Sequence, residues 1–530
     1  MKEKMQDKAK TTDKNEGKIE DKRENKIKEK IMKRIKRLWE SSDIWTAVLC
    51  MLLLLAVAAP MTYIARYVWP CSDDFEMSLW CKKALDETGS IFQVIKRAGD
   101  YAIYKWQAWE GTFSSIFLMA LQPGIWGDRY YPLGVVFLIA GLLISIFTLT
   151  YVLMVKQAGA SRAVWLILTA LPTWAWFFRA MYTEEAFYWW TGASNYTGFH
   201  SWVMLLLALA FCIYTDWESY GRVKKTLLCF VCVLCFFLGG GNYLSAMLQV
   251  LVLAGLSAGA LITKKKSGGI LAAYTLSALG GLLLSALAPG NKTHMSHDIQ
   301  SDISAVEAIF IAIRDGLEDI GQWTNLSVIL LFVFLLPFAW KLARGCSCRF
   351  RFPLLATILS GGLFLAEYAP TSYSYGGYEP GRIINLYYWN YYWLLLFNVI
   401  YWVGWLDRKL DKVCGKKLEQ AAASRKIWQP VYIMLAGVAL LAAVNSFGIK
   451  NSNFYWVCIE LKNRNYQYVD QFMEERTEYF REYQGEDVVI PEIPYKSTIT
   501  YFGDIFPDSG HLVNTTMAEY YGVKSITMAP

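Results

Sequence analysis

Charge is scarce in this sequence. Only 18% of the 530 residues are Asp, Glu, Lys or Arg, whereas 55% are hydrophobic and 16% aromatic, and the mean hydropathy is +0.25. Soluble globular chains carry about 25% charged and about 45–50% apolar residues. The shortage of charge excludes a disordered protein and argues against a soluble enzyme. The 22 Trp and 33 Tyr residues suit a protein with much surface at the two membrane interfaces, where amphipathic rings concentrate.

The apolar residues are gathered into runs that approach the roughly 20 residues a helix needs to cross a bilayer. About eleven runs meet or approach this length, and they lie at 44–66, 131–155, 161–180, 201–215, 226–240, 243–263, 269–288, 326–341, 353–369, 386–406 and 428–448. No cleavable signal peptide precedes the first run, because it follows about forty mostly polar residues. The sequence therefore predicts an all-α polytopic membrane protein with about eleven transmembrane helices.

Lys and Arg are nearly absent from the short outer connections between these runs, whereas the alternate, inner connections contain them. If the N-terminus is cytoplasmic, the basic residues of the tail and of the alternate loops all lie inside, as the positive-inside rule requires. The net charge of +7 then orients the bundle in the cell membrane and needs no nucleic-acid partner. This orientation divides the chain into a cytoplasmic charged tail (1–42), a transmembrane bundle (43–449) and an extracytoplasmic C-terminal domain (450–530).

Two outer regions have structure of their own. The long first outer loop (67–130) has helix-like apolar spacing at Ser90–Tyr104 and Trp106–Leu121, which predicts helices along the membrane surface. The C-terminal domain has a predicted helix over roughly 455–483 and then a β-like run at Asp487–Ile490. We expect a small α/β domain that caps the bundle.

Residues 69–76, Trp-Pro-Cys-Ser-Asp-Asp-Phe-Glu, directly follow the first span. Two adjacent carboxylates at the outer membrane surface can take a proton from an acceptor hydroxyl, which makes Asp73 and Asp74 the predicted catalytic residues. The same pair can hold a divalent cation, Mg²⁺ or Mn²⁺, that neutralises a phosphate leaving group. The alternative is structural: Ser72 or Asp73 caps the following helix, with Asp74 and Glu76 in its first turn.

A second polar cluster follows the third span. Glu184 and Glu185 precede Trp189, and Asn195 and Tyr196 follow it. Aromatic faces stack on sugar rings while amides and carboxylates bond to sugar hydroxyls, so these residues form a predicted substrate-binding cleft. An aromatic belt at the membrane interface would explain the rings. It does not explain the two acids, because a carboxylate at the bilayer centre costs roughly 2.5–3.5 kcal/mol.

Two more outer segments combine helix-ending Gly and Pro residues with positive charge. The first, Ala288-Pro-Gly-Asn-Lys-Thr-His294, contains Asn291, Lys292 and His294, and the second leads to Arg382. Together with Arg179 at the end of the third span, these side chains and the exposed backbone N–H groups predict a site for a donor phosphate. The alternative is ordinary helix termination with basic side chains that reach the interface.

All four clusters fall on the predicted outer side, whereas the inner loops are short and simply basic. A random choice of loop residues would not gather the acids, the aromatic residues and the Pro–Gly turns on one side. The pattern indicates one functional site on the outer face.

The segment Pro70-Cys-Ser-Asp73-Asp74-Phe75 resembles the acidic pair that follows the first span in the GT-C class of integral-membrane glycosyltransferases. More narrowly, the chain is similar to a bacterial family of multi-pass membrane proteins of unknown function. The matching stretches follow one another in order over most of the chain: Trp109-Glu-Gly-Thr-Phe113, Leu121-Gln-Pro123, Glu185-Ala-Phe-Tyr-Trp189 with Gly192, Asn195-Tyr196, Ala288-Pro-Gly-Asn291 and Tyr520-Tyr-Gly-Val-Lys-Ser525. Trp109 and Glu110 join the predicted substrate-binding set.

This resemblance implies a GT-C-like fold and a lipid-linked sugar donor, such as a polyprenyl-phosphate monosaccharide, used on the outer face. Asp73, the first acid of the pair, would deprotonate the hydroxyl of a cell-surface glycan or lipid-linked acceptor, with inversion at the sugar carbon. Some relatives have Asn-Gly-Arg where this chain has Trp109-Glu110-Gly111. The basic residue expected there is missing, which leaves the four cations named above to bind the phosphate.

Two other functions stay open. One is a transporter or flippase for a lipid-linked saccharide, whose site would lie near the middle of the membrane. The other is a non-catalytic membrane protein of envelope assembly. Convergence of the Asp73, Glu185 and Arg382 side chains would favour the transferase over both.

Overall fold

The computed structural model describes residues 42–298, 303–377, 380–414, 437 and 448–529. The predicted cytoplasmic tail before Ser42 lies outside the described residues, and so does the predicted span at 428–448 apart from Gly437 and Gly448. Every statement below about the structure refers to the described residues.

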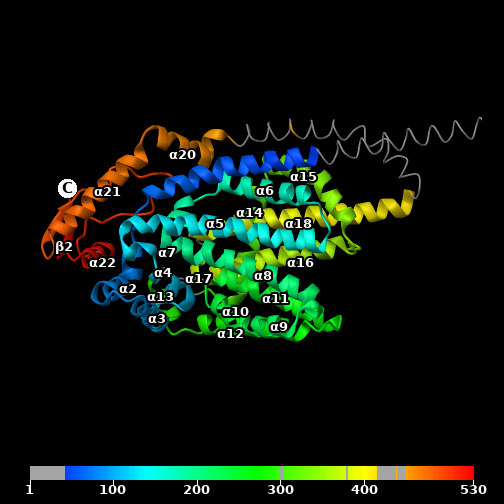
Figure 1. The fold of residues 1–530 in the computed structure, drawn as a ribbon, viewed down its shortest axis with the longest axis horizontal. Helices are drawn as coiled ribbons and strands as arrows, with labels where there is room; N and C mark the ends of the chain where they lie inside the picture. Colours follow the sequence, from blue (N-terminus) through cyan, green and yellow to red (C-terminus); the bar gives the residue numbers. More distant parts are fainter. Residues whose placement is uncertain (1–41, 299–302, 378–379, 415–436, 438–447, 530) are drawn as a thin grey trace, which may run out of the picture.

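Seven helical segments are long and apolar enough to cross a membrane, and all seven coincide with runs predicted from the sequence. They are Ser42–Tyr67, Asp128–Gln157, Trp190–Ser219, Tyr243–Ile262, Gly268–Ala286, Leu326–Gly345 and Pro353–Tyr375. Most of the long helices lie side by side along the longest axis of the molecule (Figure 1). The chain is therefore an α-helical protein that passes through the membrane several times.

Three further predicted runs are helical but are not among these seven segments. Helix α6 (Arg162–Arg179) begins and ends on Arg and contains Pro172. The run at 226–240 is divided at Phe230 into α9 (Arg222–Cys229) and α10 (Val231–Gly239). Helix α18 (Gly381–Cys414) extends far beyond its apolar run. These helices thus differ from simple apolar spans, because α6 and α18 include polar residues and the helix over the run at 226–240 is interrupted at Phe230.

The long helices pack around two apolar cores. The first core joins the first span to α5 (Tyr131–Thr150), α6, α15 (Leu326–Gly345) and α18. The second joins α8 (Phe199–Asp216), α10, α11 (Tyr243–Ile262) and α12 (Gly268–Ala286). Helices α14 (Ala305–Trp323), α16 (Pro353–Ala366) and α17 (Tyr368–Tyr375) pack together beside them.

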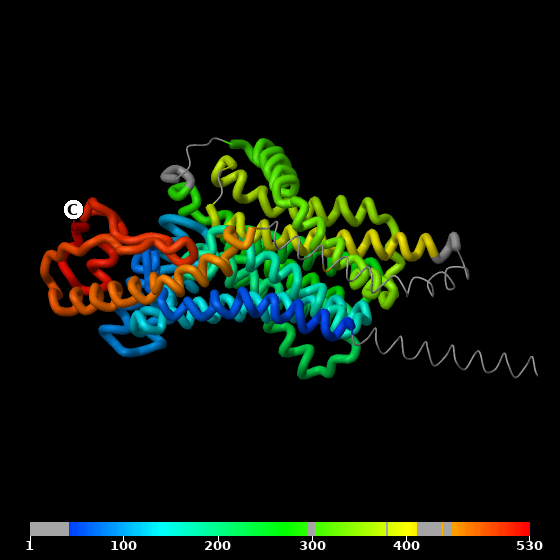
Figure 2. The backbone as a smooth tube through the Cα atoms, turned by 90° about the horizontal axis from the view of Figure 1, so that it is seen from above, coloured from blue at the N-terminus to red at the C-terminus, as the bar shows by residue number. Residues whose placement is uncertain are grey.

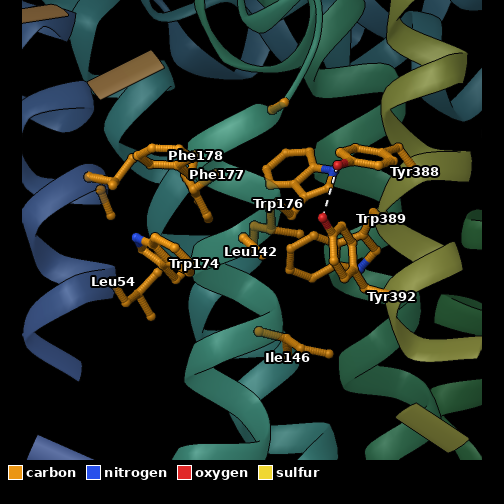
Figure 3. Packing of buried hydrophobic residues seen from close by; sticks show 14 of the residues in the cluster. Leu54, Leu142, Ile146, Trp174, Trp176, Phe177, Phe178, Tyr388, Trp389 and Tyr392 are labelled. Carbon is orange, nitrogen blue, oxygen red and sulfur yellow. Dashed lines mark hydrogen bonds between the residues drawn. The ribbon is translucent and has the colours of Figure 1, made fainter. Parts of the chain in front are cut away.

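Aromatic rings fill the first core where α6 meets α18. The Trp176 ring lies edge-on to Trp389, with ring centroids 5.0 Å apart, and its Nε1 donates a hydrogen bond to the Asn385 carbonyl. The hydroxyls of Tyr388 and Tyr392 hydrogen-bond at 2.9 Å in the same region (Figure 3). The Trp176 N–H and the two tyrosine hydroxyls therefore have partners, as burial away from water requires, whereas the Trp389 N–H has no hydrogen-bond partner within the described residues.

One end of the bundle carries a compact unit, which we call the cap. It contains α2 (Asp74–Thr88), α3 (Ile91–Ala108) and α4 (Phe113–Ala120) from the first loop. The later part of the chain adds α20 (Asn453–Lys462), α21 (Asn465–Glu482) and α22 (Leu512–Tyr521), and a parallel strand pair of β1 (Asp487–Ile490) and β2 (Ser525–Met528). Figures 1 and 2 place both parts at the same end of the molecule.

The two parts of the cap share a single apolar core. Phe75, Val94 and Ile116 of the first loop pack in the same cluster as Val488 and Ile526 of the later segment. The helices predicted at Ser90–Tyr104, Trp106–Leu121 and 455–483 and the strand at Asp487–Ile490 are all found, although the second starts at Phe113 and the third is divided at Asn463–Arg464. The later segment therefore covers the apolar side of the first-loop helices and buries it.

Glycines allow α10 and α12 to approach one another closely. A Cβ atom added at Gly281 would lie 2.1 Å from the Phe236 carbonyl oxygen, whereas one added at the neighbouring Gly280 would lie 3.7 Å from the Phe236 ring. Small residues at such positions are the usual means by which helices pack tightly in membranes.

We expect Gly281→Ala to destabilise the protein by about 1–3 kcal/mol, because the backbones must separate. Gly280→Ala is the matched control and should unfold at the wild-type temperature. Thermal unfolding of the purified protein in detergent measures both, and equal melting temperatures for the two variants would contradict the close approach.

Candidate functional site

The Asp74 carboxylate is fully buried where the cap meets the bundle. Its Oδ1 accepts hydrogen bonds from the backbone N–H (2.9 Å) and hydroxyl (2.7 Å) of Thr191. Its Oδ2 accepts from the Tyr131 hydroxyl (2.5 Å) and from the Cys71 backbone N–H (3.2 Å). Burial raises the pKa of Asp74 from 3.8 to about 6, and these donors act against the rise. Asp74 therefore joins α2, α5 and the short helix α7 (Trp190–Ala193).

Asp73 lies beside it, half-buried, and has much freer oxygens. Its Oδ1 accepts a single bond from the Ser72 hydroxyl at 3.3 Å, and Asp73 makes no side-chain hydrogen bond to the start of α2. The structural alternative is thus confirmed in part: Asp73 is the N-cap residue of α2, and Asp74 and Glu76 lie in its first turn, but Asp73 forms no side-chain cap hydrogen bond. Burial is the main cause that raises the pKa of Asp73, and Glu76 adds to it, whereas Ser72, Arg382 and Lys105 lower it. A partly exposed carboxyl with few partners can accept a proton.

Two cations, each held by a carboxylate, act on Asp73. The Lys105 Nζ lies 2.6 Å from Glu76 Oε1, and its side chain is only 9% exposed. The Arg382 Nη1 lies 3.0 Å from Glu185 Oε2, which also accepts from the Arg382 backbone N–H at 3.2 Å. Glu185 and Arg382, which are distant in the sequence, are therefore paired directly, and the charges of Arg382 and Lys105 both lower the pKa of Asp73.

Trp189 is buried beneath the later part of the cap. Its ring stacks on Phe502 with centroids 3.7 Å apart and planes 7° apart, and only 3% of the residue is exposed. A Cβ atom added at Gly192 would lie 2.5 Å from the same ring. The Arg382 guanidinium lies 5.4 Å from the Trp189 ring and 5.6 Å from the Tyr196 ring. A sugar can stack on Trp189 only where Phe502 moves aside.

Two π-helical turns, Glu184–Tyr188 and Ser194–Gly198, position this second cluster. Such turns are rare and are frequent at functional sites. Burial raises the pKa of Glu184 to about 7, with Glu185 adding to the rise. Asn195 is buried, its carbonyl accepts from Asn242 at 2.6 Å, and its side-chain oxygen has no hydrogen-bond partner within the described residues. That orphaned acceptor is available to a bound hydroxyl.

The third predicted cluster packs directly on residues 109–111. The Gly111 N–H donates to Asn291 Oδ1 at 2.8 Å, and the Asn291 amide donates to carbonyls at the end of α12. His294, in α13 (Gly290–Asp298), stacks on Trp109 with centroids 4.9 Å apart and lies 3.8 Å from a Glu110 oxygen. Asn291 therefore has a structural role, since its side chain links Gly111 to the end of α12. The contacts also place Trp109, Glu110 and His294 together.

Arg179 and Lys292 are predicted phosphate-binding residues. No contact described above links either of them to Asp73, Glu185 or Arg382. Arg179 ends α6 and lies near Tyr388 and Tyr392 of α18. Lys292 is exposed on α13. Of the predicted cations, Arg382 is therefore the one placed beside Asp73.

Sequence reasoning missed four residues that shape the site. Lys105 was hidden in an amphipathic helix, where a lysine normally indicates a solvated face. Tyr131 and Thr191 lie at helix starts among many other aromatic and hydroxyl residues. Phe502 lies in a segment with no regular structure. Only Lys105 gave a usable signal, because its side chain follows the apolar positions Val94, Ala98 and Tyr101 along α3.

The side chains do not fit a cation shared by Asp73 and Asp74. Both Asp74 oxygens already accept two hydrogen bonds each, and a bridging cation would have to displace these donors. Within the described residues no group of three or more His, Cys, Asp or Glu side chains is arranged to hold a metal ion.

Comparison with protein-family models, with curated proteins and with solved structures gives no match for this chain.

Replacement of Asp74 tests its role as a structural tie. Asp74→Asn leaves two of the four donors facing an N–H₂ group, so we expect a loss of about 1–3 kcal/mol of stability. Asp73→Asn is the matched control and should cost less than about 0.5 kcal/mol, as for a surface substitution away from a network. Thermal unfolding at pH 7.5, where Asp74 is ionised, measures both variants. A greater loss for Asp73→Asn would contradict this assignment.

Proposed function

We propose that this protein is a membrane glycosyltransferase. It transfers a sugar from a polyprenyl-phosphate-linked donor to a cell-surface glycan or lipid-linked acceptor. The observation that supports this best is the cluster at the junction of cap and bundle, where a lightly bonded carboxylate lies beside an arginine and a lysine. That combination supplies a base for an acceptor hydroxyl and positive charge for a phosphate leaving group.

In the proposed reaction Asp73 removes the proton from the acceptor hydroxyl as its oxygen attacks the anomeric carbon. The bond between that carbon and the donor phosphate oxygen breaks, and the configuration inverts. The bonding electrons leave with the polyprenyl phosphate, whose charge Arg382 and Lys105 stabilise. The side-chain oxygen of Asn195 and the Glu110–His294 pair are available to sugar hydroxyls.

The proposal includes the finer features of the resemblance. These are a GT-C-like fold of about eleven spans, a cap on the outer face of the cell membrane as its C-terminal α/β domain, and a cytoplasmic N-terminus. The positive-inside rule supports this orientation, because the basic connections 263–267 (between α11 and α12) and 346–352 (between α15 and α16) lie at the other end of the bundle from the cap (Figure 1).

A transporter or flippase is the alternative function. Its site would lie in the middle of the bundle, near Asn242 and Gln249. Both side chains are buried: Asn242 bonds to Asn195 and Ser245, and Gln249 donates to the Cys235 carbonyl, while the Gln249 side-chain oxygen has no hydrogen-bond partner within the described residues. No observation on the described residues favours this alternative over the transferase.

Asp73→Asn tests the proposed base. We expect transfer from polyprenyl-phosphate-linked sugars to fall by about 10²–10⁴-fold, because a positioned base contributes that much. The assay uses the purified full-length protein with a panel of such donors and lipid extracts or glycans as acceptors. Asp86→Asn, at the exposed end of the same helix, is the matched control. Undiminished transfer by Asp73→Asn would refute the mechanism.

The rate should also depend on pH in a defined direction. The base must be ionised, and burial raises the pKa of Asp73, so the rate should fall on acidification with a midpoint above 3.8. A profile that stays flat down to pH 4 would contradict the assignment of Asp73.

Arg382→Gln tests the proposed phosphate contact. A charge-assisted hydrogen bond contributes about 1.5–3 kcal/mol, so kcat/KM for the donor should fall by at least about tenfold. Lys96→Gln, exposed on α3, is the control and should behave as wild type. Equal kcat/KM values for wild type and Arg382→Gln would remove Arg382 from the donor site.

A further inference from the structure

A cleft lies beside the candidate site, between the linker that leaves the first span and the helix α21. Its walls are the linker Tyr67–Cys71, one face of α21 and residues 493–504. A second hollow lies against the turn Gly127–Tyr130 and the later part of α21, and Trp69 lines it too. Its lining is charged, with Asp128, Arg129, Glu474, Glu478 and Arg481, so we call the first hollow alone the Trp69 cleft.

The lining of the first hollow is aromatic and rich in hydroxyl groups. Its aromatic residues are Tyr67, Trp69, Tyr466, Tyr495, Tyr501 and Phe502. Ser497 and Thr500 add further hydroxyls. Rings that carry a polar edge, mixed with hydroxyl groups, suit a ligand that is itself a ring covered with hydroxyls.

The charges that line the first hollow cancel. Arg476 and Asp504 form a buried two-point ion pair, with N–O distances of 2.8 and 3.0 Å, and their side chains are 5% and 4% exposed. They are the only charged residues among those that line this hollow. A fully paired lining does not attract a phosphate or an ammonium group, so it favours an uncharged ligand.

The cleft lies close to the candidate catalytic residue, because one segment of its lining also contacts the residue before Asp73. Residues 502–504 line the first hollow, and a Cβ atom added at Gly503 would lie 3.4 Å from the Ser72 Cβ, next to Asp73. The Phe502 ring also covers Trp189. A ligand in the cleft would thus lie next to the segment that contacts both Ser72 and Trp189.

We propose that the Trp69 cleft binds a neutral saccharide chain, which is the acceptor of the transfer reaction. The acceptor role rests on the proposed transferase function. Trp69 is the central residue, because its half-buried ring lines the cleft while its Nε1 donates to Asp470 on α21 at 2.9 Å. A sugar that stacks on this ring lies next to Cys71 and Gly503, which also line the cleft.

Three variants of the full-length protein test the cleft. Trp69→Ala removes both the ring and its bond to Asp470. Trp69→Phe removes the bond but keeps a ring, which separates stacking from a structural role. Tyr468→Ala is the matched control, because Tyr468 is on the same helix and is 60% exposed outside the cleft lining.

Binding is measured first, without donor, with maltohexaose, cellohexaose and chitohexaose as neutral probes and the protein in nanodiscs. Aromatic contacts of this kind contribute about 1.5 kcal/mol, or about tenfold in affinity. We expect at least one probe to bind, Trp69→Ala to weaken it about tenfold or more, and the other two variants to bind within about threefold of wild type. Absence of binding by all three probes, or equal binding by wild type and Trp69→Ala, overturns the proposal.

The transfer assay then separates the cleft from the catalytic proposal. With a transferred acceptor, Trp69→Ala should raise the acceptor KM about tenfold and leave kcat and the donor KM within about twofold. If the saccharide binds in a Trp69-dependent way but the wild type transfers no sugar, the transferase function is refuted and the saccharide-binding site stands. Transfer with an unchanged acceptor KM in Trp69→Ala would refute the cleft alone.

Discussion

The arrangement at the end of the bundle depends on one buried carboxylate. Burying a charged group is expensive unless hydrogen bonds compensate it, and Asp74 meets this requirement with donors from three different elements. Tyr131 extends the network, because its hydroxyl also accepts from the Trp190 N–H at 2.8 Å. Asp73 directly precedes Asp74 in the chain. The same network therefore fixes where the Asp73 carboxylate, the proposed base, lies.

Charge balance imposes a second constraint on the site. Lys105 and Arg382 are each already paired with a carboxylate, Glu76 and Glu185. An anionic ligand must therefore share each cation with its existing partner. Competition of this kind weakens the binding of a simple phosphate and makes additional contacts to the rest of a substrate more important.

The sequence was informative wherever a signal is local. Apolar runs predicted the seven candidate spans, and acids beside apolar helices drew attention to Asp73 and Glu185 because they have no place in lipid. Pairing across the chain has no local signal. Lys105 lies 29 residues from Glu76, and Phe502 reaches Trp189 from a segment without regular structure. Only the folded chain shows that the Asp74 carboxylate accepts four hydrogen bonds whereas the Asp73 carboxylate accepts one.

The shared core of the cap also has a consequence for the order of assembly. Ile526 of β2 is fully buried in the same cluster as Phe75 of α2, and nearly the whole chain separates the two. During synthesis, the loop made first must wait with its apolar face uncovered until residues 512–528 leave the ribosome, when the seven candidate spans have already been made. Contacts between such distant segments form late and slowly. The cap therefore closes only after the seven candidate spans have been made, and until then the apolar side of α2 around Phe75 stays uncovered.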